Sequence, residues 1–273
     1  MKILITGYKG FIGKNLLKKL NGSDQYQVDV IELEDFYTDE STSISRLVEI
    51  LNEKSPNVIF HVGACSDTLE TRVNYMMILN YESTKIICDW ANQNNAKVVY
   101  SSSAASYGTN DEFPSNLYGW SKYVGEGYVI SNGGIGLRYF NVYGPGEENK
   151  GRMSSVAYQV HLKNKKSEEI KLFPGNPKRD FVYVKDIILA NLYALENFET
   201  LKGQWYDVGY SEARTFEDVI KCMGIEKFTY YDKDEIPKGY QFYTKSKKLM
   251  PGWKPKYPIE IGLEEYTKVL NNE

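Results

Sequence analysis

The stretch Lys2-Ile3-Leu4-Ile5-Thr6-Gly7-Tyr8-Lys9-Gly10-Phe11-Ile12-Gly13 decides the expected fold. It opens with a short apolar run, which is typical of a buried parallel strand, and the residues after Gly10 continue as a helix. Glycines between a strand and a helix permit a tight turn, and they leave the helix N-terminus facing the phosphates of a dinucleotide. A plain turn is the alternative. The contacts expected with the dinucleotide are Gly7, Gly10, Phe11, Ile12 and Gly13.

The second predicted strand, residues 27–31, ends at Glu32. Glu32 follows the last glycine by about 20 residues, the position where a carboxylate binds the ribose hydroxyls of adenosine. Glu34 and Asp35 come next, and this run of carboxylates would repel a 2′-phosphate, so the sequence favours NAD over NADP. A polar loop after a strand is the alternative. Leu33 is a further expected cofactor contact, and Asp39 could touch the adenine.

Strand and helix patterns alternate as far as Tyr143, which predicts an α/β fold with a doubly wound parallel sheet. Residues 180–184 read as a strand that returns to this sheet, and residues 187–197 as its helix. Beyond Gly144 the pattern loosens and prolines become frequent, which indicates a smaller lobe. We therefore expect a dinucleotide-binding domain over residues 1–143, with residues 178–210 returning to it. Residues 144–177 and 211–273 are expected to form a substrate-binding lobe.

A strand predicted over residues 58–62 ends in Gly63-Ala64, small residues that let a cofactor pass close to the backbone. His61 in this strand is interpreted as a packed side chain rather than a catalyst. Asn80 lies within a helix expected over residues 75–94, where it could stabilise the helix or the cofactor loop. The other contacts expected with the cofactor are Val62, Gly63, Ala64, Ser66, Asn80 and Val142.

Hydroxyl groups follow the strand predicted over residues 97–100, at the edge where an open α/β sheet binds its ligand. Ser103 could donate to a substrate oxygen that becomes a carbonyl. Downstream, Tyr118 and Lys122 are spaced to share one face of a helix. A lysine ammonium beside a phenol lowers the pKa of the phenol, which could then take a proton from a sugar hydroxyl. The alternatives are a capping serine in a polar loop and a solvated Tyr–Lys pair.

Composition and charge limit the classes of function. The chain has 273 residues, of which 42% are hydrophobic and 25% charged, as in an ordinary globular protein. A net charge of −3 argues against nucleic acid as the main partner. Cys65, Cys88 and Cys222 show no metal or redox spacing, which fits a reducing compartment. No apolar run approaches the ~18 residues of a membrane span, and Met1 leads directly into a strand, so we expect a cytoplasmic protein without metal.

Several longer segments carry a family resemblance: residues 61–68 (HVGACSDT), 137–145 (LRYFNVYGP), 150–153 (KGRM), 178–184 (KRDFVYV) and 238–241 (KGYQ). With the glycine turn and the Tyr–Lys pair, they make the chain similar to the extended short-chain dehydrogenase/reductases that act on nucleotide sugars. Within that group it most resembles the ADP-L-glycero-D-manno-heptose 6-epimerases. It departs from them at Gln159, where a histidine is common, and in the acidic run after Glu32, since those enzymes usually take NADP.

The resemblance implies an NAD(P)-dependent epimerase that works through a transient keto intermediate, and it implies a homo-oligomer. It makes Ser103, Tyr118 and Lys122 the catalytic trio, with the last two also at the cofactor, and Lys150 a second acid/base on the opposite side of the substrate carbon. The implied substrate contacts are Asn141, Arg152, Gln159, Phe173, Asn176, Arg179 and Tyr240. Alternatives are a UDP-, GDP- or CDP-sugar 4-epimerase or reductase and a non-catalytic cofactor-binding scaffold. Ala104-Ala105 argue against a dehydratase, which carries an acidic residue there.

Overall fold

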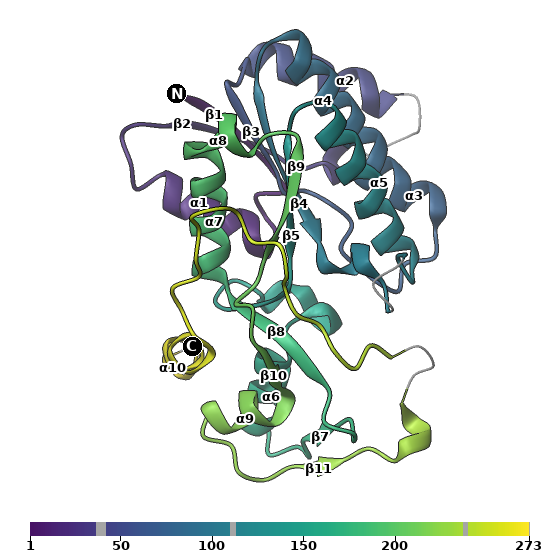
Figure 1. Ribbon diagram of the computed structural model, residues 1–273, viewed down its shortest axis with the longest axis vertical. Helices are drawn as coiled ribbons and strands as arrows, with labels where there is room; N and C mark the ends of the chain where they lie inside the picture. Colours follow the sequence, from purple (N-terminus) through teal and green to yellow (C-terminus); the bar gives the residue numbers. More distant parts are fainter. Residues whose placement is uncertain (37–41, 110–112, 237–239, 273) are drawn as a thin grey trace. The chain divides into compact units, whose positions relative to one another are not determined.

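The computed structural model describes residues 1–36, 42–109, 113–236 and 240–272, and only the backbone of residues 42–45 (Figure 1). Asp39, Lys238 and Gly239, which the sequence analysis named, lie outside the described residues. The chain divides into two compact units. We call Met1–Arg138 with Ile188–Tyr206 the first unit, and Tyr139–Ile187 with Asp207–Glu273 the second unit.

The first unit is organised around a sheet of six strands in the order β2-β1-β3-β4-β5-β9. Its strands are β1 (Lys2–Thr6), β2 (Gln27–Ile31), β3 (Val58–His61), β4 (Lys97–Ser103), β5 (Ile135–Tyr139) and β9 (Gln204–Val208). β1 pairs in parallel with β2 and β3, and β3 in parallel with β4. The order reverses at β1, so the expected doubly wound parallel sheet is confirmed.

Helices cover both faces of this sheet (Figure 1). One face carries α1 (Phe11–Leu20), α7 (Val184–Glu196) and α8 (Phe198–Leu201), and the other carries α2 (Thr42–Lys54), α3 (Val73–Met77), α4 (Ser83–Gln93) and α5 (Leu117–Ser131). Leu4, Ile59 and Val98 align across three strands and pack in one buried cluster with Trp90 of α4 and Val129 of α5. Because both faces are covered, the strands read as continuous apolar runs rather than as an alternating pattern.

The long helix expected over residues 75–94 is interrupted. A π-helical turn, η2 (Ile78–Glu82), separates α3 from α4 and carries the buried Asn80. Such turns occur mostly as single insertions in helices and are frequent at functional sites. Short 3-10 segments, η1 (Glu34–Phe36) and η3 (Ala104–Tyr107), follow β2 and β4.

The second unit contains a three-stranded sheet in the order β10-β8-β6 and a two-stranded sheet of β11 and β7. The strands are β6 (Asn141–Tyr143), β7 (Lys171–Leu172), β8 (Lys178–Tyr183), β10 (Ala213–Thr215) and β11 (Thr229–Tyr230). The helical segments are η4 (Glu148–Met153), α6 (Val156–Lys165), α9 (Phe216–Cys222), η5 (Lys233–Glu235) and α10 (Ile259–Asn271). The helix α6 begins at Val156, shortly after η4 ends.

The expectation that residues 180–184 return to the main sheet is wrong. They form β8, which pairs in parallel with β6 and antiparallel with β10 in the second unit. The strand that joins the main sheet beside β5 is β9. An apolar run predicts a buried strand, but the strand's partner depends on which distant backbones meet it. Val142, expected in the dinucleotide-binding domain, accordingly lies on β6 in the second unit, and only residues 188–206 return to the first unit.

Residues 240–258 of the second unit run mostly without helix or strand, and buried aspartates hold them. Asp180 accepts hydrogen bonds from the Ser246 backbone N–H at 2.8 Å and from its hydroxyl at 2.6 Å. Asp207 accepts from the N–H groups of residues 247 and 248, and Asp186 from those of residues 256 and 257. Within the described part of the chain, no helix is suited to cross a membrane and no cluster of His, Cys, Asp or Glu is suited to hold a metal.

Candidate active site

The turn between β1 and α1 fits a bound diphosphate. Gly7 has φ +72°, and a Cβ on it would lie 2.4 Å from the Gly63 Cα. A Cβ on Gly13 would lie 2.0 Å from the Gly7 carbonyl oxygen, so both positions require glycine. Gly10 is the N-cap of α1, and no described side chain caps it. The N-terminus of α1 therefore directly follows the glycine turn, the position at which a helix end can bind an anion.

Glu32 lies directly against this turn, because its Oε1 accepts a hydrogen bond from the Lys9 backbone N–H. Burial raises the pKa of Glu32, while the Lys9 amide and ammonium oppose that rise. The Lys9 ammonium lies 3.5 Å from the Asp35 carboxylate. Leu33 is buried, and its Cδ1 would lie 3.2 Å from a Cβ on Gly63. The acidic run after β2 and the glycine turn thus form one region.

The segment after β3 completes the predicted cofactor contacts of the first unit. Gly63 N–H donates to the Thr6 hydroxyl at 2.8 Å. The Asn80 side chain holds the backbone of Cys65 from both sides, accepting from its N–H at 2.7 Å and donating to its carbonyl at 2.9 Å. Val62 and Ala64 are half-buried and Ser66 is exposed. Asn80 therefore shapes the loop that carries these residues, which is one of the two roles expected for it from the sequence.

Ser103, Tyr118 and Lys122 come together in the first unit. Ser103 ends β4 and caps η3, with its Oγ accepting from the Ala105 N–H at 3.1 Å. Its side chain also lies close enough to the Tyr118 phenol of α5 to lower the pKa of that phenol. Lys122 lies one turn further along α5, is buried, and donates from Nζ to the Ser101 carbonyl at 2.7 Å. A phenol, a hydroxyl and a buried amine thus share the carboxyl end of β4.

The electrostatics of this trio differ from the expectation. Burial lowers the pKa of Lys122 to about 7, against the opposing influence of Cys65 and Glu126. Burial raises the pKa of Tyr118, while the Ser103 side chain lowers it. The prediction that Lys122 brings the phenol pKa below its ordinary value is therefore wrong for this structure. The reason is desolvation, which leaves the Lys122 amine only partly charged near neutral pH and disfavours the phenolate.

Two features that position α5 were missed in the sequence analysis. Gly125 lets α5 lie close to β4, because a Cβ there would lie 2.7 Å from the Tyr100 hydroxyl. Arg138 of β5 forms a buried pair with Glu126 of α5, with contacts of 2.6–3.1 Å, and its guanidinium lies 3.8 Å from the Trp205 ring centroid. A glycine inside a helical pattern is the only one of these that leaves a local signal in the sequence.

Lys150 lies in η4 of the second unit. Burial lowers the pKa of its ammonium, and Glu147 opposes that shift. Glu147 is fully buried and accepts from the Gly144 N–H at 3.2 Å, from the Ser155 hydroxyl at 2.8 Å and from the Ser155 N–H. The Glu147 carboxylate therefore fixes the shape of the loop that presents Lys150.

Arg179, predicted to bind a diphosphate, is buried in the second unit among aromatic rings. Its Cζ lies 5.1 Å from the Tyr240 ring centroid, and its Nη1 donates to the Lys178 carbonyl at 3.1 Å. Burial lowers the pKa of this guanidinium, and no carboxylate in the described part of the chain pairs with it. The Phe173 ring lies 4.9 Å from that of Tyr240. A desolvated cation beside tilted aromatic rings suits a phosphorylated aromatic ligand.

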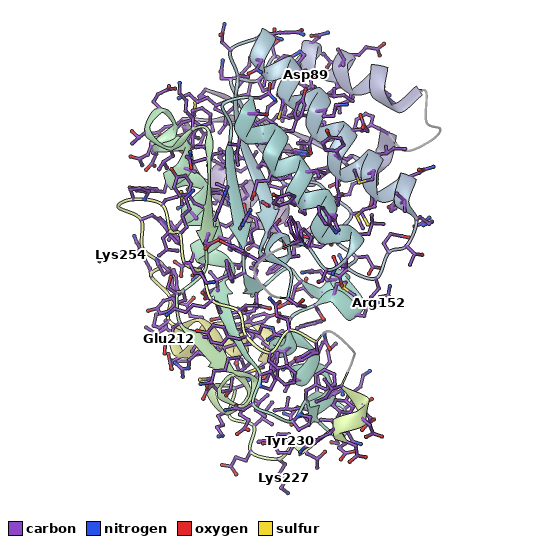
Figure 2. All side chains as sticks on the ribbon, turned by 45° about the vertical axis from the view of Figure 1, so that its right-hand side comes forward. Asp89, Arg152, Glu212, Lys227, Tyr230 and Lys254 are labelled. Atoms are coloured by element: carbon purple, nitrogen blue, oxygen red, sulfur yellow. The ribbon has the colours of Figure 1, made fainter. Side chains whose placement is uncertain are left out.

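The remaining predicted substrate contacts also lie in the second unit. The Asn141 amide donates to the Asp180 carbonyl and the Thr244 hydroxyl, both at 3.3 Å. The Gln159 amide donates to the Ser154 carbonyl at 2.8 Å. Asn176 occupies a left-handed turn at φ +55°, and Arg152 is exposed on η4 (Figure 2). Asn141 and Gln159 thus use their amides on the protein's own backbone or side chains, while Arg152 and Asn176 stand at the surface.

Comparison with known proteins identifies the family. The NAD dependent epimerase/dehydratase family model matches residues 3–209. The chain is 33% identical to ADP-L-glycero-D-manno-heptose-6-epimerase of Brachyspira hyodysenteriae, over 98% of this chain and 97% of that protein. The Helicobacter pylori enzyme of the same name superposes with a TM-score of 0.83 at 30% identity, covering 100% of this chain and 96% of that one. A UDP-glucose 4-epimerase of Thermotoga maritima superposes with a TM-score of 0.86 at 22% identity, covering 100% of this chain and 99% of that one. The chain belongs to the NAD dependent epimerase/dehydratase family.

Proposed function

We propose that this protein interconverts two epimers of a nucleotide sugar through a transient ketone, with ADP-glycero-manno-heptose, epimerised at carbon 6, as its substrate. The convergence of Ser103, Tyr118 and Lys122 at the end of β4 carries this proposal. Such an arrangement supplies a proton acceptor, a hydroxyl that orients the reacting oxygen, and a cation that stabilises the phenolate.

In the proposed reaction, bound NAD supplies reversible hydride transfer to and from the substrate carbon. Tyr118 takes the proton of the sugar hydroxyl as the C–H bond breaks, which leaves a carbonyl. The Ser103 hydroxyl donates to that oxygen. Burial raises the pKa of Tyr118 and lowers that of Lys122, so we propose that the protonated form of Lys122 stabilises the phenolate, and we expect the activity to depend on it.

Lys150 is proposed as the second acid/base. Epimerisation through a ketone needs proton transfer at the oxygen on either face of the sugar, since the intermediate turns before the C–H bond re-forms. Burial lowers the pKa of Lys150, which increases the fraction of neutral amine able to accept a proton near neutral pH. The two acid/base groups then serve opposite epimers.

The substrate's nucleotide is proposed to bind the second unit. Arg179 would contact the diphosphate, for which a guanidinium provides bidentate donors. Phe173 and Tyr240 offer rings on which a base can stack. The other proposed contacts are Asn141, Arg152, Gln159 and Asn176.

We propose NAD rather than NADP as the cofactor. It would be held by the glycine turn, by Glu32 and Leu33, and by the Val62–Ser66 segment, Asn80, Tyr118, Lys122 and Val142. Glu32, Glu34 and Asp35 disfavour a 2′-phosphate, and the Lys9 ammonium already lies near Asp35. Calorimetric titration of apo-protein with both nucleotides tests this, and tighter NADP binding would refute it. A cytoplasmic location and a homo-oligomer stay predictions, the latter testable by light scattering.

The deciding experiment incubates the holo-protein with each ADP-heptose epimer and follows their ratio by NMR. Interconversion supports the heptose assignment, whereas none with the cofactor bound refutes it. A panel of UDP-, GDP- and CDP-sugars in the same assay detects a 4-epimerase or reductase. Two results together would indicate a non-catalytic scaffold. The wild-type protein would be inactive on every substrate, and a Tyr118→Phe variant would fully replace it in cells.

A further inference from the structure

His61 lies at the centre of a buried chain of polar groups in the first unit. It ends β3 and has no exposed surface. Its Nδ1 lies 2.9 Å from the Thr6 hydroxyl, and its Nε2 lies 2.8 Å from the Thr84 hydroxyl. The proposed reaction makes no use of this imidazole.

The partners on either side determine which ring nitrogen carries the proton. The Thr84 hydroxyl donates to the Asn80 carbonyl at 2.8 Å, so its oxygen can only accept from His61. His61 Nε2 must therefore carry the N–H. A neutral imidazole has one N–H, so Nδ1 accepts from the Thr6 hydroxyl. The Thr6 oxygen in turn accepts from the Gly63 N–H at 2.8 Å.

This chain of hydrogen bonds joins the two halves of the catalytic region. At one end, Thr6 immediately precedes the glycine turn and bonds the segment after β3. At the other end, Asn80 of the π-helical turn bonds the Cys65 backbone and donates to the Ser121 hydroxyl of α5 at 2.9 Å. Ser121 then donates to the Tyr118 carbonyl at 2.7 Å. The groups that shape the cofactor loop and the helix that bears Tyr118 thus share one network.

We propose that His61, held as the neutral Nε2–H tautomer between Thr6 and Thr84, is a positioning residue that sets α5 and its Tyr118 relative to the glycine turn. This inference rests on the proposed function for its catalytic consequence, but the tautomer itself does not depend on that function.

The surroundings favour the neutral ring. Burial lowers the pKa of His61 to about 3, and the Lys122 charge on α5 acts in the same direction. Tyr100 of β4 packs against the imidazole, with ring centroids 5.3 Å apart. A protonated ring would place a second N–H against the Thr6 hydroxyl, and that hydroxyl would lose its acceptor. The tautomer should therefore persist through the pH range in which the enzyme works.

The first test is NMR on holo-protein with ¹⁵N-labelled histidine. The chain has only two histidines, and a His161→Gln variant assigns the signals. We expect His61 to show a proton on Nε2 alone, unchanged from pH 5 to 9. A proton on Nδ1, or titration within that range, would overturn the proposal. This measurement needs no substrate, so it stands even if the proposed reaction fails.

The second test compares Thr84→Val, Thr84→Ser and Ser83→Ala by kcat, KM, NAD affinity and Tm. Thr84→Val keeps the shape but removes the hydroxyl, and we expect kcat to fall by ~10²-fold through misplacement of Tyr118, with KM and NAD affinity little changed. Thr84→Ser should recover most of the rate. Ser83 is the residue before Thr84, and its hydroxyl donates to the Leu79 carbonyl. Ser83→Ala removes this hydrogen bond, and we expect its kcat to stay near the wild-type value.

The outcomes separate positioning from folding. If Thr84→Val and Ser83→Ala lowered kcat equally, and in proportion to their loss of Tm, the network would have only a structural role. A Thr84→Val variant with wild-type kcat and an unshifted pH profile would refute the positioning role outright. If wild type itself turns over no nucleotide sugar, the proposed function fails, and the NMR result alone decides the state of His61.

Discussion

The two units of the chain use buried polar groups differently. In the first unit, buried side chains connect regular elements, as in the contacts that run from Thr6 through His61 and Thr84 to the Asn80 backbone carbonyl. In the second unit, Asp180, Asp186 and Asp207 accept hydrogen bonds from backbone N–H groups of an irregular segment, residues 240–258.

The difference concerns what each network holds in place. Helices and strands satisfy their own backbone groups, so polar side chains of the first unit are free to orient reactive groups. An irregular segment leaves its N–H groups without such partners, and buried carboxylates must supply the acceptors. We therefore expect substitutions in the first unit to change rates, and substitutions of the buried aspartates to change stability.

The largest effect is expected for Tyr118→Phe. Loss of the proton acceptor should lower the epimerisation rate by ~10²–10⁴-fold, as for other general acid–base groups. NAD binding, measured by calorimetry, should survive because the glycine turn and Glu32 are untouched. Tyr128→Phe is the matched control on α5, since it removes only a surface hydrogen bond to Asp89, a residue labelled in Figure 2. Equal rates in the two variants would remove Tyr118 from the mechanism.

Lys150→Ala should slow one direction of the reaction more than the other. The loss expected for that direction is also ~10²–10⁴-fold, whereas Tyr118→Phe should affect the opposite epimer most. Initial rates from each pure epimer, followed by NMR, measure this asymmetry. Lys165→Ala, on the exposed end of α6, is the control. Near-normal rates in both directions for Lys150→Ala would mean that Tyr118 serves both faces and that the two-base mechanism is wrong.

Asp180→Asn tests the second unit. The carboxylate accepts from the N–H groups of Tyr210, Ser211 and Ser246, and an amide cannot replace both oxygens as acceptors. We expect the free energy of unfolding, from urea titration, to fall by ~1–3 kcal/mol. Asp89→Asn, on an exposed helix surface, should change it little. A stability equal to wild type for Asp180→Asn would show that the irregular segment is held by other contacts.

The smallest effect is a pH dependence of stability. The folded-state pKa of Lys122 is about 7 and its ordinary value is 10.5, so between these values the unfolded chain binds more protons than the folded one. Stability should therefore rise with pH across that window, by up to about 1.4 kcal/mol per pH unit. Lys122→Met should lack this contribution, and urea unfolding at pH 7, 8 and 9 measures the difference. Parallel curves for the two proteins would mean that Lys122 stays charged.

Local chemistry determined much of this protein from the sequence alone. The glycine turn, the acidic run after β2, the alternation of strands and helices and the spacing of Tyr118 and Lys122 depend on residues close together in the chain. Their geometry follows from periodicity and turn chemistry, and the doubly wound sheet could be predicted from them. The family was expected from the resemblance that longer segments carry, such as residues 61–68 and 178–184.

Only the tertiary structure decided the rest, because those features depend on residues that are distant in the chain. Asp180 lies in a strand, as expected, but its strand joined the second unit because its hydrogen-bonding neighbours are β6 and β10. The pKa values of Tyr118 and Lys122 moved with burial, which no local spacing reports. The Asn80–Ser121 bond joins residues 41 positions apart. Desolvation and strand pairing arise only in the packed fold. The pKa shifts and hydrogen bonds of the candidate site could therefore be seen only in the tertiary structure.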